Sequence, residues 1–444
     1  MTTLYVIGFI IAFLLILGSG IPVGFGLGVL ALGIMTAYAD IDTALGLCID
    51  QAYASLDTDV LVAIPLFVLA AQLISATGMG KRLFDAAKAC MGGFRSGLGA
   101  ATIASSGVFS AMTGSSFVSA STMGLIAIPE LRRAKYTDTL ISSAIAAGGS
   151  LGSVIPPSLV MIIYGYLTDE SIGKLFMAGV IPGILLMVLY SVALAILTGK
   201  KPSAAGKNGT DTSDTDSEEE TDEEAPMPLG KALKESVWGL MAPIIILGGI
   251  YLGIFTANEA AAVAVLYCII IGLWVYRTLN YKSLWQVVSS ATAITGMVAL
   301  VVIGGSMLAQ AAVYGRVPQQ ILELIIAKEL SSGLLLFLVI VILFVLGMFM
   351  ESVSLMYLAI PLLYPVVVHM GWDNIWFAVI LLINVNLGLI TPPMGGVLYI
   401  ISQIGAIPFE TVVKGAIMPI IVLLLVMVMM IIYPPIATWL PSLM

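Results

Sequence analysis

The chain has 444 residues, of which 60% are hydrophobic and 10% are charged, and its formal net charge at pH 7 is −8. Soluble domains carry about 25% charged residues, so the composition excludes an ordinary soluble protein and predicts a polytopic α-helical membrane protein. The apolar runs are long and continuous, which excludes the alternating pattern of a transmembrane β-barrel.

Groups that usually carry catalysis or bind metal ions are sparse. Cys48, Cys90 and Cys268 are isolated in the sequence, and His369 is the only histidine. Zinc and iron sites need clusters of such ligands, and no Gly-rich phosphate loop ending in Gly-Lys-Ser/Thr is present. An intramembrane enzyme would need a reactive pair of side chains, which a lone histidine does not supply. We therefore predict a protein without catalytic residues and without a cofactor.

The first part of the chain contains long apolar runs that predict membrane-spanning helices. Five are expected, at about 4–18, 21–38, 59–77, 138–167 and 175–198. The acidic stretch DIDTALGLCIDQAYASLDTD, between the second and the third of these helices, has no basic residue. We place it on the periplasmic side, because basic residues mark the cytoplasmic side of a membrane protein.

A different kind of segment lies between about residues 78 and 135. It is an apolar stretch rich in Gly, Ser and Thr, with basic residues at both ends: Lys81, Arg82, Lys88 and Arg95 before it, and Arg132, Arg133 and Lys135 after it. Both ends should therefore face the cytoplasm. The stretch at about 97–131 is predicted to enter the membrane and return as a re-entrant helical hairpin, with its turn near 111–122.

A polar tract divides the chain near its middle. Residues 199–231 read GKKPSAAGKNGTDTSDTDSEEETDEEAPMPLGK and contain few large apolar side chains, which is typical of a disordered spacer. We assign 1–198 to a first repeat, 199–237 to an acidic cytoplasmic linker and 238–444 to a second repeat.

The two halves share short motifs in the same order. IAIPEL, GSVIPPSLV and MAGVIPGIL in the first half correspond to LAIPLL, GLITPPMGG and KGAIMPIIV in the second. Three pairs in register indicate an internal repeat. Counting spans from the first hairpin, a second hairpin at about 332–368 must enter from the periplasmic side, with its turn near 347–354. The repeat is therefore inverted, and both termini are predicted to be periplasmic.

Each half also carries a Pro-Pro pair inside an apolar run, at Pro156–Pro157 and Pro392–Pro393. Proline removes a backbone donor and clashes with the preceding turn, so the helices at about 138–167 and 374–405 should be broken. Unwound backbone is tolerated at membrane depth only where it faces protein or a wet cavity. Two hairpin tips that meet two broken helices would form a binding centre near the midplane of the membrane.

These residues resemble the large membrane subunit of the tripartite ATP-independent periplasmic (TRAP) transporters, within a wider ion-transporter superfamily. The resemblance covers nearly the whole chain except the linker. It is carried by IPLFVLAAQLISATGMG, GVFSAMTGSSFVSASTMG, GSVIPPSLVMIIYG, FTANEAAAVAVLY and GLITPPMGGVLY. The linker is longer than is usual in that family.

The resemblance implies an all-α, elevator-type secondary transporter of the bacterial inner membrane. It would import a small organic acid together with Na⁺. A periplasmic substrate-binding protein would deliver the acid, and a small four-helix membrane subunit would brace the large one, with no role for nucleic acid. The alternative is a carboxylate transporter or antiporter of the same superfamily that needs no binding protein.

Sodium prefers oxygen ligands, which hydroxyls, amides and freed backbone carbonyls supply. The candidate sodium-binding residues lie at the two tips and the two breaks: Ser115, Ser116, Gly149, Gly152, Pro156, Glu351, Ser352, Ser354, Asn386, Thr391 and Pro392. The candidate substrate-binding residues are Gly114, Ser119, Thr122, Ser153, Ser158 and Gly395.

Two acids have alternative explanations. Glu351 could couple the ion to transport, form a structural hydrogen bond or lie in a wet tip, because an acid at membrane depth is costly unless it has such a role. Glu259, in TANEAAA, is expected to cap or orient a helix of the scaffold. No Lys or Arg lies near the proposed tips or breaks, so an acidic substrate would be held by helix N-termini, backbone N–H groups and hydroxyls.

Overall fold

The computed structural model describes residues 21–91, 97–199 and 228–444, and every regular element in these ranges is helical. The first half contains α2 (Val23–Met35), α3 (Ile41–Leu56), α4 (Ala63–Thr77), α5 (Met79–Met91), α6 (Gly97–Thr113), α7 (Ser116–Arg133), α8 (Asp138–Ser150), α9 (Leu159–Thr168) and α10 (Ile172–Gly199). The second half contains α11 (Leu229–Tyr251), α12 (Ala257–Ile270), α13 (Tyr281–Tyr314), α14 (Val317–Ala327), α15 (Ser332–Gly347), α16 (Ser352–His369), α17 (Asn374–Leu389), α18 (Gly396–Gly405), α19 (Phe409–Ile432) and α20 (Pro435–Thr438).

The predicted all-α membrane class is confirmed. Six described helices are long and apolar enough to cross a membrane, and the bent pair α4–α5 would make a seventh. The helix expected at 4–18 and most of the acidic linker lie outside the described residues. The helix α11 begins at Leu229, so the helical chain resumes inside the range 199–237 that was assigned to the linker. Its buried Ala232 and Ser236 explain why these residues join the helix.

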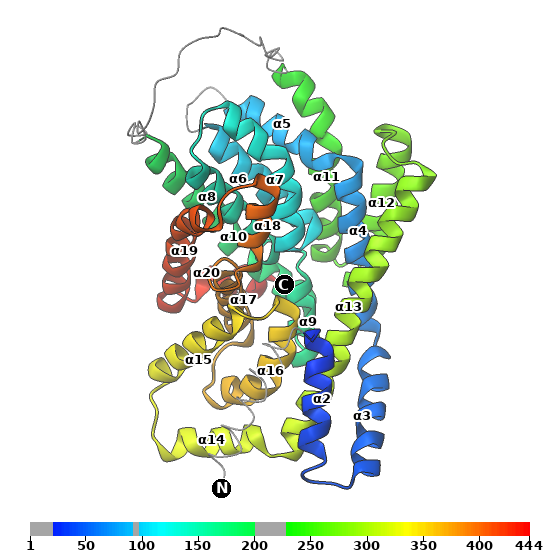
Figure 1. Cartoon of the computed structure of the whole chain (residues 1–444), viewed down its shortest axis with the longest axis vertical. Helices are drawn as coiled ribbons and strands as arrows, with labels where there is room; N and C mark the ends of the chain where they lie inside the picture. Colours follow the sequence, from blue (N-terminus) through cyan, green and yellow to red (C-terminus); the bar gives the residue numbers. More distant parts are fainter. Residues whose placement is uncertain (1–20, 92–96, 200–227) are drawn as a thin grey trace, which may run out of the picture.

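The predicted hairpins and broken helices are also confirmed. Helices α6 and α7 pack against each other and are joined by Gly114 and Ser115, while α15 and α16 are joined by residues 348–351. The first broken helix consists of α8 and α9, and the second of α17 and α18. Figure 1 shows the hairpin α6–α7 in cyan toward one end of the long axis and the hairpin α15–α16 in yellow toward the other.

A scaffold of tilted helices lies beside these elements. The long α13 packs against α2, and α12 packs against α4, so each half contributes one helix to each pair. Figure 1 shows α13 running along the molecule, with α2 and α3 beside its lower part. The α2–α13 contact is very close: a Cβ atom on Gly304 would lie 2.0 Å from the carbonyl oxygen of Gly24. Only glycine allows two backbones to approach in this way.

In each half, one scaffold helix leads into a helix that lies across one end of the molecule: α4 into α5, and α13 into α14 (Figure 1). Helices α4 and α5 differ in direction by 62°, and Gly78 between them has φ +71°. The guanidinium of Arg82 donates to the carbonyls of Thr77 and Gly78 at 3.2 Å, which pairs carbonyls that the end of α4 leaves free. Figure 1 shows α5 and α14 at opposite ends of the long axis.

The acidic stretch before α4 forms a helix that the sequence analysis did not predict. The carboxylate of Asp40 accepts a hydrogen bond from the backbone N–H of Thr43 at 3.0 Å and so caps α3 at its N-terminus. Helix α3 packs against α13, and it buries Ala44, Cys48 and Ser55. The Asp cap followed by small residues at spacings of four and seven was the signal that could have revealed this helix.

We expect Gly304→Ala to lower the free energy of unfolding by about 1–3 kcal/mol, because the new methyl group would overlap the Gly24 backbone. Gly296→Ala in the same helix is the matched control, since a Cβ there meets nothing within 4 Å. It should be neutral or slightly stabilising, because Ala is the better helix former. Thermal unfolding in detergent would measure both variants, and equal midpoints would contradict the close contact.

Candidate functional site

The tip of the first hairpin lies against the break of the first helix. Gly114 has φ +62°, and a Cβ on it would lie 2.4 Å from the carbonyl oxygen of Pro157. A Cβ on Gly152 would lie 2.6 Å from the carbonyl carbon of Ser115. The backbones of the tip and of the break are therefore in direct contact, with glycine on both sides.

Three polar side chains join this contact to the second half of the chain. The hydroxyls of Ser116 and Ser153 lie 2.6 Å apart, and each donates to Oδ1 of Asn386 at 3.1 Å. The side-chain amide of Asn386 donates to the carbonyl of Leu382 at 2.8 Å. All three side chains are buried. Ser116 and Asn386, which were predicted as sodium-binding residues, are brought together, and Ser153, predicted for substrate, lies with them.

The tip of the second hairpin meets the second broken helix in a similar way. A Cβ on Gly388 would lie 2.5 Å from the carbonyl carbon of Gly347. Asn384 donates from Nδ2 to the carbonyl of Ile340 at 3.0 Å, whereas its Oδ1 is buried and has no hydrogen-bond partner among the described atoms. Asn384 is not among the residues that the sequence predicted for this site. Its spacing of two residues from Asn386, just before the Pro-Pro pair, could have indicated it.

Residues at the two tips cap the second arm of their hairpins. The hydroxyl of Ser115 accepts from the backbone N–H of Val118 at 3.5 Å, at the start of α7. The carboxylate of Glu351 accepts from the backbone N–H of Val353 at 3.0 Å, at the start of α16. The structural hydrogen bond, one of the three roles weighed for Glu351, is thus present. Glu259 forms a capping box with Thr256 at the start of α12, as predicted.

Three other candidates form hydrogen bonds that do not involve Ser116, Ser153 or Asn386. Ser119 lies within hydrogen-bond distance of Ser110 and Thr113 inside the first hairpin. The hydroxyl of Thr122 lies 3.0 Å from that of Ser75 in α4, so it faces the scaffold and not the break. Thr391 donates back to the carbonyl of Leu387 at 2.6 Å.

The remaining candidates lie at the tips and breaks without a side-chain partner that defines a role. The hydroxyl of Ser158 is buried and has no partner among the described atoms. Ser352 and Ser354 are buried in the first turn of α16. Gly149 faces Ala120 of the first hairpin, and Gly395 has φ +37° before α18. Pro156 and Pro392 each begin a cis Pro-Pro bond in one of the two breaks.

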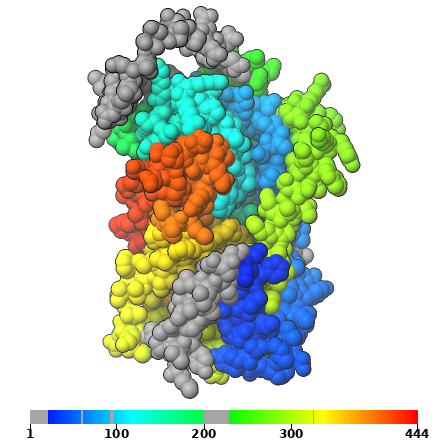
Figure 2. Space-filling model, viewed as in Figure 1, coloured from blue at the N-terminus to red at the C-terminus, as the bar shows by residue number. Residues whose placement is uncertain are grey.

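The second part of each broken helix packs against the hairpin of the other half. Helix α18 lies on α7, where a Cβ on Gly396 would be 2.7 Å from the ring of Phe117. Helix α9 lies on α16. In Figure 2 the orange surface of the α18 region lies directly beside the cyan surface of the first hairpin. The first turns of α7, α9 and α18 therefore meet around Gly114, Ser158 and Gly396.

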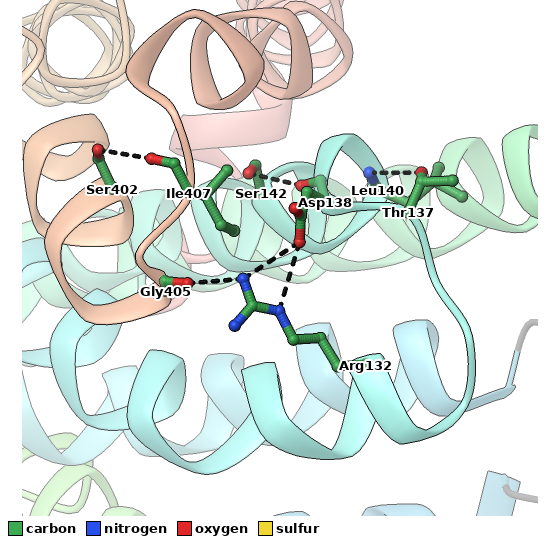
Figure 3. A network of polar contacts seen from close by, with 8 residues as sticks. All are labelled: Arg132, Thr137, Asp138, Leu140, Ser142, Ser402, Gly405 and Ile407. Carbon is green, nitrogen blue, oxygen red and sulfur yellow. Dashed lines mark hydrogen bonds and ion pairs between the residues drawn. The ribbon is translucent and has the colours of Figure 1, made fainter. Parts of the chain in front are cut away.

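An arginine connects the base of the first hairpin to both broken helices. Nη2 of Arg132 donates to the carbonyl of Gly405 at 2.6 Å, at the end of α18, and lies 3.3 Å from Oδ1 of Asp138, at the start of α8 (Figure 3). A cation is favourable at the C-terminus of a helix, where carbonyls are unpaired. Ser402 donates to Ile407 just beyond this helix end. Arg132, which in the sequence marks the cytoplasmic end of the hairpin, thus also holds the hairpin against both broken helices.

The arrangement is rich in neutral oxygen atoms and helix N-termini. Hydroxyls, an amide oxygen and the backbone carbonyls that two breaks free from helical pairing are groups that can replace the hydration shell of a small cation. The N-termini of α7, α9 and α18 can face an anion. In the described residues, the tips and breaks contribute no lysine or arginine to this centre.

The sequence comparisons with known proteins agree on one family. The model of the "Tripartite ATP-independent periplasmic transporter, DctM component" family matches residues 9–436. The chain is 33% identical over 442 residues to the sialic acid TRAP transporter large permease protein SiaM of Vibrio cholerae, and the match covers 98% of each chain. It is 33% identical over 382 residues to the C4-dicarboxylate TRAP transporter large permease protein DctM of Pseudomonas aeruginosa, which covers 84% of each. The solved YdaH transporter of Alcanivorax borkumensis shares the fold, with a TM-score of 0.65 over 90% of each chain at 13% identity.

We expect Asn386→Leu to lower the free energy of unfolding by about 1–3 kcal/mol, because Ser116 and Ser153 would lose a shared buried acceptor. Thr391→Val is the matched control. Its hydroxyl bonds only to the carbonyl of Leu387, in the last turn of the preceding helix α17, so the loss should be smaller. Thermal unfolding of the two variants in detergent would measure the difference. Equal losses would mean that the amide of Asn386 does not hold the two hydroxyls.

Proposed function

The chain belongs to the DctM-component family of tripartite ATP-independent periplasmic transporters, and we propose that it is the large membrane subunit of a sodium-coupled importer of a small organic acid. Relatives named as permeases for sialic acid and for C4-dicarboxylates are each 33% identical to it. Both substrates are carboxylates, which supports a carboxylate as the cargo. The single observation that carries the proposal is the buried cluster of Ser116, Ser153 and Asn386, where a hairpin tip meets both broken helices.

The chemistry of this cluster suits sodium. Its hydroxyls and amide oxygen are hard, neutral ligands, and the adjoining break adds backbone carbonyls. The unpartnered hydroxyl of Ser158 and the unpartnered Oδ1 of Asn384 are further buried oxygens on the first and second broken helices. Buried polar atoms without partners are rare, and an absent ion or water is one reason for them. We propose sodium binding at both tips, with Glu351 close to the second.

An anionic substrate would be held without a cationic side chain. The first turns of α7, α9 and α18 present unpaired N–H groups at the first tip, and these carry partial positive charge. Bound sodium ions would add positive charge beside them. Sodium and the acid would therefore favour each other's binding, which is the coupling that a symporter needs.

The packing supports an elevator movement. Hairpins and broken helices hold each other through backbone contacts, at Gly114 against Pro157 and at Gly388 against Gly347, so they can move as one body. The scaffold pairs α2–α13 and α4–α12 are also closely packed. Between the two bodies, Thr122 bonds to Ser75, and Gly305 lies against Tyr357. We propose that the contacts between the two bodies change as one body slides past the other, while the contacts within each body are kept.

The assembly follows from the family. We propose a small four-helix membrane subunit that covers part of the scaffold and a periplasmic protein that delivers the acid. The complex would lie in the bacterial inner membrane, with the acidic linker in the cytoplasm and both termini in the periplasm. The alternative is a transporter of the same fold that works without a binding protein.

Sodium should raise the unfolding midpoint of the purified chain relative to potassium at the same ionic strength. A ligand at about 100 times its dissociation constant adds roughly 2.7 kcal/mol of stability. Ser116→Ala should remove most of the rise, because it deletes a hydroxyl of the cluster. Ser142→Ala, whose hydroxyl bonds to its own helix, should keep it. The same curve in both salts would exclude tight sodium binding to the isolated subunit.

Uptake in proteoliposomes would test the transport proposal. With the small subunit and the binding protein present, an inward sodium gradient should drive accumulation of the labelled acid, with sialic acid and succinate as the first probes. A potassium gradient should not. Accumulation that is equally fast without the binding protein would favour the alternative, and Ser116→Ala should slow uptake in either case.

A further inference from the structure

A cavity of about 490 Å³ lies apart from the tips and breaks. Its walls come from three parts of the chain. Lys174 belongs to the start of α10, Asp373 and Ile375 to the start of α17, and the rest to the C-terminal segment. The residues of that segment are Pro435, Thr438, Trp439, Pro441 and Ser442. None of the candidate sodium or substrate residues lines it.

The ends of the adjoining helices place this cavity at one face of the membrane. Helices α10 and α19 are both long enough to span, and they pack against each other. The cavity takes its lysine from the first turn of α10 and its C-terminal wall from just after the end of α19. The start of α10 and the end of α19 therefore both lie at the level of the cavity. Trp439 is 57% exposed and Tyr433 is 61% exposed, as is typical of aromatic residues at the boundary between lipid and water.

The cavity combines opposite charges with apolar surface. None of the ion pairs found in the described residues includes Lys174 or Asp373. One oxygen of Asp373 accepts the backbone N–H of Trp376 at 2.8 Å, which leaves its other oxygen for a second partner. Thr438 and Ser442 add hydroxyls, and Ile375, Pro435 and Trp439 add apolar area.

We propose that this cavity binds the headgroup of a phospholipid that carries a phosphate and a primary ammonium group, as phosphatidylethanolamine does. Lys174 would pair with the phosphate, and the free oxygen of Asp373 would accept a hydrogen bond from the ammonium. The acyl chains would leave between the ends of α10 and α19, along Ile375 and Trp439. A lipid with only a negative charge would leave Asp373 unpaired, and one with a methylated ammonium could not donate to it.

The test measures the unfolding midpoint of the full chain in detergent with added lipids that share the same acyl chains. Phosphatidylethanolamine should raise the midpoint by a few degrees more than phosphatidylcholine or phosphatidylglycerol does. Lys174→Gln and Asp373→Asn should each remove this preference. Asparagine caps helices as well as aspartate does, so the second variant should still fold. Lys282→Gln, an exposed lysine at the start of α13, is the matched control and should keep the preference.

Three results would overturn the proposal. Equal rises with all three lipids would show that no headgroup is selected. An equal rise with phosphatidylglycerol that only Lys174→Gln removes would assign the cavity to anions. A rise with free phosphoethanolamine as large as that with the lipid would show that the acyl chains do not contribute.

Discussion

Backbone groups that a broken helix frees cannot be paired by lipid, and this constraint determines the packing of the molecule. Each break must be covered by protein, and in each case the cover is a hairpin tip. Close cover leaves no space for side chains at the contact. The glycines at 114, 152, 347 and 388 lie where backbone touches backbone. At the same contacts, backbone carbonyls and N–H groups of the hairpin tips and of the breaks lie close together.

Neither half of the chain can build the candidate site alone. The amide of Asn386, from the second half, accepts from two serines of the first. Helix α18 covers the first hairpin, and α9 covers the second. Each half of the inverted repeat therefore supplies the helix that packs against the hairpin of the other half. It also gives both tips related surroundings, although a serine caps one second arm and a glutamate caps the other.

Features that follow from local chemistry were predictable from the sequence. The Pro-Pro pairs predict the breaks. The basic residues on both sides of 97–131 predict a hairpin whose two ends lie on the same side of the membrane. Helix α3 was missed because its acidic residues were used only to place the stretch on one side of the membrane, although Asp40 is a good cap. The cluster of Ser116, Ser153 and Asn386 could be proposed only as separate candidates, because its hydrogen bonds depend on how distant segments pack. For the same reason the sequence left three roles open for Glu351.

The bond from Arg132 to the carbonyl of Gly405 joins residues that are 273 positions apart. During synthesis the first hairpin enters the membrane long before its partner exists. At about 5–20 residues per second, the ribosome needs on the order of tens of seconds to make the intervening chain. Throughout that interval the guanidinium has no helix end to cap, and the surface that α18 will cover is open. Biogenesis of this protein therefore passes through a stage in which the first hairpin is made but the helix that covers it is not.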